Sequence, residues 1–570
     1  LFELDEDDVY ITSACIAGWK YEDATEIWYR VAKHFGSSFF LEYQANNTDE
    51  QKKINSIIYE LSQSAGIKTI IGLDTHYISE EDRIKRDNLL KRKGIRYPEE
   101  DGWYMDFPTG TEIFERMTEQ GVIPPEEIIY AMMNTHVFNE GCEELEYNTK
   151  FKIPILEKYK GKSYEERSKI LFDLLNKKYN EEDFEHRTED RKEGMLYEYS
   201  EIDGSGTADY FLDNYELIDL AVNKYGGHIT TTSRGSASSY YSSKLLGFTT
   251  MDRFESEVPI RSEVTKDRIL NSHQMPDIDI NCQSQEPFVL AGKELCGEHG
   301  CYPLLAVGRL KEKNGFKLYA GVNGIEPSVA NEITKSIDRY NEALKNAEEE
   351  DRDLIEIEDY ITDKHHLKLF NESKSYQEII EQAKVHACGF ALFNGVEGEE
   401  DVPGYGDIRY EIGLIRCHSE STGKTTIVAN IEGSLLDKYG YVKDDFLIVD
   451  VVGIIHKLYA AIGREVPSVT ELRKMVTEDE KTWRMYEIGA TCCLNQCEKA
   501  STTKKVMKFK PKNIKELAAF IAGIRPGFKS LINGFLDRVE YTNGEPAIDE
   551  LLEDCFHYML YQEAVMKIFS

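Results

Sequence analysis

The chain has 570 residues, 41% of them hydrophobic and 30% charged, which is typical of a large globular protein. No apolar run approaches the length of a membrane span, and an odd number of scattered cysteines favours reduced thiols, so we expect a cytoplasmic protein. The net charge of −35 argues against nonspecific binding of nucleic acid by the whole surface.

The first hundred residues alternate short apolar runs with a segment of helical spacing. Strands are predicted at 39–43 and 68–74, and the helix between them covers 49–66 and ends at Gly66. This alternation predicts an α/β domain.

A second helix follows the strand at 68–74. Ser79 and Asp82 have the spacing of a capping box, so this helix begins just beyond Asp74 and His76. A carboxylate and an imidazole at the carboxyl end of a strand suit a metal site, although a surface turn accounts for two such residues equally well.

Residues 106–200 are mostly helical and charged, with an amphipathic helix within 158–179. A further helix over 208–227 is stopped by Gly226 and Gly227.

The segment after this helix, residues 228–248, is rich in serine and glycine. Around Ser238, the chain offers backbone amides, hydroxyls and one guanidinium just before a helix, which favours binding of anionic phosphates. A flexible linker is the alternative, but the apolar run at 240–246 indicates a packed segment.

Residues 275–281, MPDIDIN, alternate acid with isoleucine. In a strand, Asp277 and Asp279 project to one side about 6.5 to 7 Å apart, while Ile278 and Ile280 anchor the other side. A divalent cation bound with a third acid would relieve the repulsion between them. A half-buried edge strand with two solvated acids explains these seven residues about as well.

Two other segments have weaker signals. Gly423-Lys424-Thr425 resembles the end of a phosphate-binding P-loop, but His418 replaces the first glycine and 425–432 alternates like a strand, so a hairpin is predicted. A run of lysines without acids suits phosphate binding or a solvated helix face; it contains Lys499, Lys504, Lys505, Lys508, Lys510, Lys512 and Lys515.

These motifs together resemble a known family. SRGSASS at 233–239, followed about forty residues later by MPDIDIN, resembles the phosphate loop and catalytic strand of the C-family bacterial replicative DNA polymerases, the DNA polymerase III alpha subunits. Five further segments match in the family's order: HACGFALF at 386–393, YVKDDFLIVDVVGII at 441–455, LNQCEK at 494–499, AGIRPGF at 522–528 and YQEAVM at 561–566. The segments at 11–18, 39–43 and 72–82 resemble the latter half of the polymerase and histidinol phosphatase (PHP) domain.

The resemblance implies an α/β and α+β multidomain fold. It has a partial PHP α/β domain, a nucleotidyltransferase-like (polymerase beta-like) palm with a mixed sheet, and a helical thumb and fingers. The expected boundaries are 1–105 for the C-terminal part of the PHP domain, 106–155 for a helical connector, 156–295 for the first palm segment, 296–380 for the thumb, 381–463 for the second palm segment and 464–570 for the N-terminal part of the fingers.

The resemblance also implies site residues. Asp277 and Asp279 match the first two catalytic, metal-binding aspartates, and an ungapped match makes Asp445 the third, with Asp450 as the alternative. Nucleotide or phosphate binding is expected of Arg234, Gly235, Ser236, Ser239, Arg268 (or Arg261), Lys443, Gln496, Glu498 and Arg525. Contacts with DNA are expected of Lys313, Lys317, Lys504 and Lys505.

The implied activity is template-dependent 5′–3′ addition of dNMP to a primer 3′-hydroxyl, with two Mg²⁺ ions, or Mn²⁺, as cofactors and with release of pyrophosphate. The implied partners are primer–template DNA, dNTP and, through further C-terminal regions, a sliding clamp and replisome proteins. An inactive replisome scaffold and a PHP phosphoesterase are the alternatives; Cys15, Asp74 and His76 would be the surviving PHP metal ligands. We expect either a fragment or a compact, phage-like variant.

Overall fold

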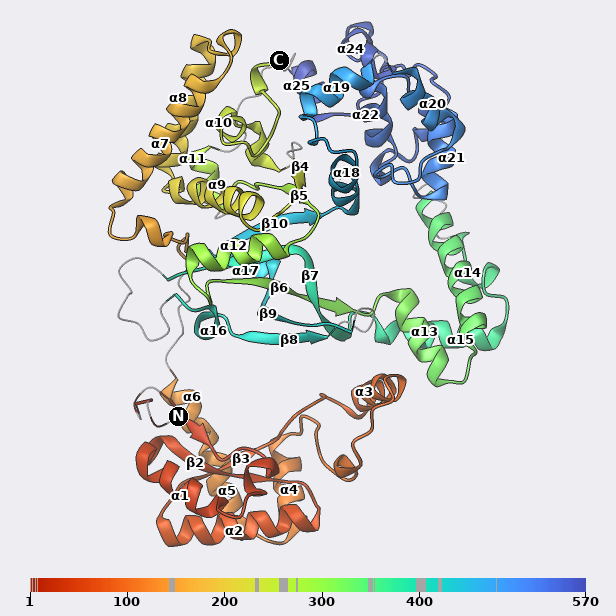
Figure 1. Cartoon of the computed structure of the whole chain (residues 1–570). Coiled ribbons are helices and arrows are strands. Elements are labelled where there is room, and N and C mark those ends of the chain that lie inside the picture. The colour runs from red at the N-terminus through yellow and green to blue at the C-terminus, as the bar shows by residue number, and fades with distance from the viewer. Residues whose placement is uncertain are drawn as a thin grey trace. The chain divides into compact units, whose positions relative to one another are not determined.

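The computed structural model describes residues 2, 4–5, 7, 9–142, 149–230, 235–255, 265–272, 275–346, 352, 354–395, 406–418, 423–477 and 479–569. The chain divides into two compact units, one of residues 1–146 with 309–381 and the other of 147–308 with 382–570 (Figure 1). In the described part of the chain, no helix is both long enough and apolar enough to cross a membrane.

The first unit begins with a small parallel sheet in which β1 (Ile11–Thr12) pairs with β2 (Phe39–Gln44) and β2 with β3 (Thr69–Gly72). The helices around it are α1 (Ala24–Phe35), α2 (Asp49–Ala65), α3 (Glu80–Arg92), α4 (Gly110–Gln120), α5 (Pro125–Met133) and α6 (Thr135–Gly141). As predicted, α2 ends at Gly66, whose φ of 68° is left-handed, and Ser79 caps α3. The α/β prediction for this segment is confirmed.

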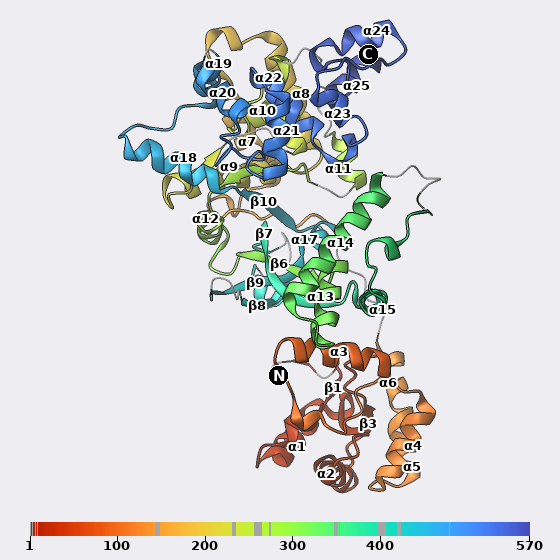
Figure 2. The same cartoon turned by 90° about the vertical axis from the view of Figure 1, so that its right-hand side faces the viewer.

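The helices in the segment expected as a connector, 106–155, pack against the small sheet. Ile113 and Met117 on α4 and Ile128 on α5 are buried in the same hydrophobic core as Phe39 and Leu41 of β2. Figure 2 shows α4 and α5 side by side next to the strands. The apolar faces of these helices complete the core of the small sheet, so they are part of that domain.

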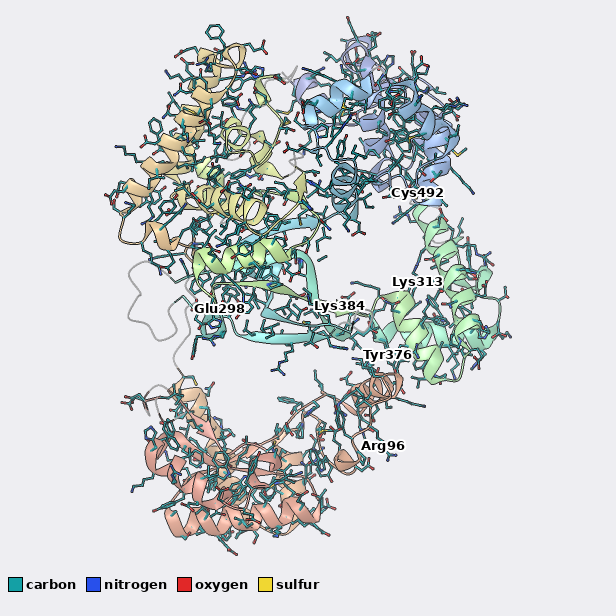
Figure 3. All side chains as sticks on the ribbon, viewed as in Figure 1. Arg96, Glu298, Lys313, Tyr376, Lys384 and Cys492 are labelled. Atoms are coloured by element: carbon teal, nitrogen blue, oxygen red, sulfur yellow. The ribbon has the colours of Figure 1, made fainter. Side chains whose placement is uncertain are left out.

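The rest of the first unit is helical: α13 (Glu312–Val322), α14 (Pro327–Asn346) and α15 (Lys364–Ser373). Phe316, Ile337 and Phe370 are buried in its hydrophobic core. Tyr376, labelled in Figure 3, accepts a 2.7 Å hydrogen bond from the side chain of Asn88 on α3.

The second unit contains a mixed sheet of seven strands within the described residues, in the order β4-β5-β10-β7-β6-β9-β8. The strands are β4 (Ile229–Thr230), β5 (Ile280–Cys282), β6 (Cys301–Arg309), β7 (Ile380–Leu392), β8 (Leu414–His418), β9 (Thr425–Glu432) and β10 (Val442–Ile448). The strand β6 falls within the range expected for the thumb, 296–380, but is part of this sheet. The predicted hairpin is confirmed by the antiparallel pairing of β8 with β9.

Helices cover one face of the sheet, with α9 and α12 running side by side (Figure 1). These helices are α7 (Tyr164–Glu181), α8 (Glu189–Gly204), α9 (Ala208–Asn223), α10 (Tyr241–Leu245), α11 (Lys266–Ser272) and α12 (Glu286–Cys296). Their apolar side chains form one core with Ile280 of β5, Phe390 of β7 and Phe446 of β10. This core fixes the strands that carry the acidic residues.

Short helices α16 (Ile408–Glu411) and α17 (Gly433–Lys438) connect strands of the sheet. The remaining helices follow β10: α18 (Asp450–Ala461), α19 (Val469–Thr477), α20 (Glu480–Ile488), α21 (Ala500–Phe509), α22 (Ile514–Gly523), α23 (Ile532–Leu536), α24 (Pro546–Leu551) and α25 (Gln562–Phe569). Several of them share a separate aromatic core that includes Phe509, Phe520 and Phe535.

Candidate active site

The acidic motif leads into β5, which runs parallel to its neighbour β10 in the sheet. Phe446 of β10 is opposite Ile280 of β5. Asp445 and Asp279 each come one residue before these two, so they lie next to each other. The strand β5 begins only at Ile280, so the prediction that both acids are within a strand is wrong. The predicted alternation is confirmed: Ile278 and Ile280 are buried, Asp279 is half-buried and Asp277 is exposed.

Lys443 lies among the acids on the same face of β10 as Asp445. Its Nζ is 3.0 Å from Asp445 Oδ2 and 3.9 Å from Oδ2 of Asp437, on α17. Burial opposes the charge of Lys443, but its hydrogen bond and ion pair with Asp445 raise the pKa of the lysine above its usual value. Burial, with the charges of Asp277 and Asp445, raises the pKa of Asp437. The described part of the site is therefore strongly negative, with Lys443 as a partial counter-ion.

The predicted phosphate loop is attached directly to the acidic segment. The backbone nitrogen of Ala237 donates a 3.1 Å hydrogen bond to the carbonyl oxygen of Asp277, and the backbone nitrogen of Asp277 donates one of 3.2 Å to Ser236 Oγ. Gly235 has a φ of 72° and a ψ of 168°, and a Cβ there would lie 2.3 Å from the carbonyl oxygen of Asp277. Only glycine allows this approach.

Within the loop, Ser236–Ser239 form one 3-10 turn that leads into α10. Ser239 is buried, and its hydroxyl donates a 2.8 Å hydrogen bond to the carbonyl oxygen of Ser236. Arg234 and Arg261 lie outside the described residues, so the predicted guanidinium of the loop has no structural description.

The end of the loop is held by a buried carboxylate that the sequence analysis missed. Glu198 on α8 accepts hydrogen bonds from the backbone nitrogens of Tyr241 and Ser242, at 2.9 and 2.7 Å. It also accepts one from Arg253, at 2.7 Å. Glu198 thus caps the first turn of α10, immediately after the loop.

The opposite face of β10 carries an unusual acid. Asp444 is buried, and neither of its carboxylate oxygens has a hydrogen-bond partner in the described part of the chain. Burial raises the pKa of Asp444 to about 7. Asp213, on α9, is also buried, and burial with the charges of Asp209 and Asp444 raises its pKa.

The neighbouring strand β7 carries a histidine and a cysteine close to Asp445 of β10. Asp445 pairs with Gly389 across the antiparallel β7 and β10, and ligand atoms of His386, Cys388 and Asp445 all lie within 4.8 Å of one another. Burial, and then the negative charge of Asp445, raises the pKa of the Cys388 thiol. Within the described residues, this is the one group of three side chains spaced for a metal ion.

The strand register places Asp279 next to Asp445, but the three acids Asp277, Asp279 and Asp445 are more widely spaced than that group. Asp445 Oδ1 is buried without a hydrogen-bond partner among the described residues. A carboxylate oxygen in that state, beside two further carboxylates, fits a divalent cation. The alternative third acid, Asp450, is exposed at the first turn of α18, beyond the end of β10.

The other residues predicted to bind nucleotide are on segments other than β5, β10 and the serine-rich loop. Arg268 is exposed on α11, while Gln496, Glu498 and Arg525 are exposed in the helical region after α18. Gln496 has a φ of 64°, the left-handed conformation of a tight turn.

The predicted DNA-contacting lysines are on helix surfaces. Lys504 is exposed and Lys505 half-buried on α21; on α13, Lys317 is half-buried, while the exposed Lys313, labelled in Figure 3, pairs with Asp338 at 2.8 Å. Lys313 is therefore already partly neutralised.

Cys15, Asp74 and His76 do not form a metal cluster in the described residues. His76 Nδ1 lies 2.7 Å from the carbonyl oxygen of Asp74, and Asp74 has a φ of 49°. This is the geometry of a tight turn after β3, which agrees with the surface-turn interpretation.

Two protein-family matches cover the segments that contain the candidate site residues. The family described as the bacterial DNA polymerase III alpha NTPase domain matches residues 168–447, and the bacterial DNA polymerase III alpha subunit finger domain matches residues 452–570. The first match contains the loop at 235–239 and the three acids, and the second contains Gln496, Glu498 and Arg525.

Curated relatives match over almost the whole chain. The DNA polymerase III subunit alpha of Borreliella burgdorferi is 26% identical, over 99% of this chain and 49% of the relative. Those of Aquifex aeolicus and Bacillus subtilis are each 24% identical, over 94% and 97% of this chain and 47% of each relative. The chain spans about half the length of the curated relatives it matches. The two domain matches, in the same order, and these relatives show that the chain belongs to the bacterial DNA polymerase III alpha family.

Proposed function

We propose that this chain carries the nucleotidyl-transfer site of a template-directed DNA polymerase, which adds dNMP to a primer 3′-hydroxyl and releases pyrophosphate. The observation that supports this most directly is the pair of hydrogen bonds between Asp277 and the loop at Ser236 and Ala237. Because of these bonds, a loop suited to binding phosphate adjoins carboxylates suited to binding metal. Phosphoryl transfer needs both at one place.

Asp277, Asp279 and Asp445 are proposed to hold divalent cations, Mg²⁺ or Mn²⁺, at this edge of β5 and β10. Bound there, such cations would lower the pKa of the primer hydroxyl and neutralise charge on the triphosphate. The carboxylates of the chain supply the negative charge that keeps cations at this point. Asp445 contributes an oxygen, Oδ1, that has no hydrogen-bond partner among the described residues.

The loop is proposed to bind the triphosphate. Ser236 Oγ accepts its hydrogen bond from the backbone of Asp277, so the hydroxyl hydrogen remains available for donation to a phosphate oxygen. Ser239 donates within the loop and is buried, so we assign it to shaping the loop instead of binding phosphate.

Lys443 is proposed to neutralise the triphosphate or the primer terminus. It lies within reach of Asp445 and Asp437 and stays protonated, since its pKa is raised. A phosphate that binds here can replace one of these carboxylates as the partner of the ammonium group.

The proposed roles of these residues also suggest a domain assignment. We propose that the seven-stranded sheet with α7–α12 is the palm, that α13–α15 form the thumb, that α18–α25 belong to the fingers and that residues up to 141 are PHP-related. Lys313, Lys317, Lys504 and Lys505 are proposed to contact the DNA backbone, and Arg268, Gln496, Glu498 and Arg525 the nucleotide. Because the chain carries a charge of −35, binding to primer–template should be weak. The proposed lysine–phosphate contacts should make that binding weaker still as salt is added.

The test is primer extension at low salt with Mg²⁺ and only the nucleotide that the template specifies. The wild-type chain should add that nucleotide, and Asp279→Asn should reduce the rate about 100-fold or more, since a metal-ligating carboxylate supplies several kcal/mol of transition-state stabilisation. Binding of primer–template without addition of any nucleotide by the folded wild type would instead support the scaffold alternative.

A further inference from the structure

His386, Cys388 and Asp445 offer three different donor atoms at one point. The first two are on β7 and the third is on the neighbouring β10, and all three side chains are half-buried. Their ligand atoms lie within 4.8 Å of one another. The proposed polymerase chemistry uses only Asp445 of the three, so the histidine and cysteine have no role in it.

Gly389 allows two of the ligand atoms to lie close to the backbone of β7. A Cβ on Gly389 would lie 2.8 Å from His386 Nδ1, 2.9 Å from Leu304 Cδ1 and 3.0 Å from Asp445 Oδ1, so two ligand atoms and one apolar carbon adjoin the position that a larger residue would fill. Asp445 Oδ1 is the buried oxygen without a hydrogen-bond partner in the described residues, while Oδ2 pairs with Lys443. One ligand atom is thus buried, has no hydrogen-bond partner among the described residues, and lies next to the position that a Cβ at Gly389 would take.

The donor set selects the class of metal. A thiolate, an imidazole and a carboxylate are the ligands of zinc sites that have three protein ligands and one open position, whereas Mg²⁺ prefers oxygen alone. With bonds of about 2.0 to 2.3 Å, tetrahedral ligand atoms lie roughly 3.5 Å from one another. The side chains would therefore need to close by about 1 Å around the ion.

The histidine is the weakest of the three ligands. His386 Nδ1 already accepts hydrogen bonds from the backbone nitrogens of Gly389, at 2.7 Å, and Cys388, at 3.3 Å. Binding of a metal through this ring costs those two bonds. Cys388 and Asp445 should therefore contribute more to affinity than His386.

We propose that His386, Cys388 and Asp445 form a binding site for a soft divalent cation such as Zn²⁺, and that occupation of this site inhibits nucleotidyl transfer because it occupies Asp445. The inhibition, but not the binding, rests on the proposed function. Cys388 makes the site selective for soft cations over the Mg²⁺ that supports catalysis.

Binding is tested by titrating the reduced, metal-free chain with Co²⁺, which gives a thiolate-to-metal charge-transfer band only when a cysteine is a ligand. Cys492 and Cys493 are exposed, with their sulfurs 3.8 Å apart, and could bind the probe themselves. Both are therefore changed to serine in every variant. Figure 3 labels Cys492.

In that background we expect a charge-transfer band that Cys388→Ser removes and His386→Gln weakens by a smaller amount. Ser is nearly isosteric with Cys but is a poor ligand for soft metals, so the fold is preserved. A far-UV circular dichroism spectrum checks this. An unchanged band in Cys388→Ser overturns the proposal.

Inhibition is tested by primer extension in excess Mg²⁺ with increasing Zn²⁺, each variant being compared with its own zinc-free rate. Cys388→Ser should raise the half-inhibitory Zn²⁺ concentration at least about tenfold. Equal zinc sensitivity in both proteins overturns the inhibitory role. If the chain extends no primer but Cys388→Ser still abolishes the Co²⁺ band, the proposed function fails and the soft-cation site stands.

Discussion

The backbone nitrogen of Ala237 donates a 3.1 Å hydrogen bond to the carbonyl oxygen of Asp277, so the serine-rich loop and the acidic segment form one structural element. The two are about forty residues apart in the chain. A displacement of either one is therefore expected to displace the other.

The first prediction concerns Gly235, whose missing side chain permits this contact. Gly235→Ala places a Cβ 2.3 Å from the Asp277 carbonyl oxygen, in a backbone conformation that is almost exclusive to glycine. The loop must move, and we expect primer extension to slow on the order of 100-fold, because a shift of about 1 Å costs that much.

The matched control is Gly247→Ala. Gly247 also has a positive φ, of 80°, but nothing lies within 4 Å of its Cβ position. This variant should lose some stability to backbone strain, about 1 kcal/mol, and little activity. Equal losses of activity in both variants would contradict the proposed role of the contact.

The second prediction concerns the pH dependence of stability. Asp444 has a pKa raised from 3.8 to about 7 in the folded protein, so the folded state keeps a proton that the unfolded state releases between these values. Stability due to Asp444 therefore falls as the pH rises from about 4 to 7, by an amount on the order of 4 kcal/mol.

Asp444→Asn removes this titration while keeping the size of the side chain. The free energy of unfolding of the variant minus that of the wild type should therefore be larger at pH 8 than at pH 5. Urea unfolding of both proteins at the two pH values measures this difference. Asp450→Asn, at an exposed position, serves as the control and should show no such difference. A pH-independent difference between wild type and Asp444→Asn would show that Asp444 does not titrate in this range.

The third prediction concerns the carboxylate that holds the end of the loop. Glu198→Ala leaves two backbone nitrogens of α10 and the side chain of Arg253 without their acceptor. We expect a loss of about 3 to 5 kcal/mol in the free energy of unfolding, as for other buried charges that lose a partner.

Glu193→Ala, on the exposed side of the same helix α8, is the control and should change stability by no more than about 0.5 kcal/mol. Chemical denaturation of both variants at neutral pH makes the comparison. Similar small effects would mean that the Glu198 hydrogen bonds contribute little to the stability of this region.

The fourth prediction separates metal binding from nucleotide binding at Lys443. Lys443→Gln removes the cation next to Asp445, so the acids should bind Mn²⁺ more tightly, by about tenfold, while the KM for dNTP rises. Calorimetric titration with Mn²⁺ and steady-state extension kinetics measure the two effects.

Lys438→Gln, on the exposed part of α17, is the charge-matched control and should alter neither quantity. Weaker binding of Mn²⁺ by Lys443→Gln would contradict the view that this lysine and the metal compete for the same carboxylates.

Local sequence patterns predict the local features of this protein well. The alternation at Ile278 and Ile280 gives the buried and open faces correctly, and Ser79 and Gly66 mark helix ends, because each depends on neighbours in the chain. The spacing of Lys443 and Asp445 likewise predicts that they share one strand face, and their ion pair confirms it.

Features set by distant pairing could not be read in this way. The helices α4 and α5 look like a connector in the sequence, since their packing against β2 depends on the tertiary fold. The cluster of His386 and Cys388 with Asp445 depends on the register of β7 with β10, and the capping of α10 by Glu198 depends on the packing of α8. None of these has a local sequence signal.

The central claim, that Asp277, Asp279 and Asp445 form the catalytic centre, is tested most directly by incorporation of a single nucleotide in Asp445→Asn and Asp450→Asn. Both substitutions remove one carboxylate, five residues apart, but only Asp445 lies next to Asp279. The account predicts that Asp445→Asn slows incorporation about 100-fold or more while Asp450→Asn stays near the wild-type rate. A loss in Asp450→Asn with near-normal incorporation by Asp445→Asn would contradict it.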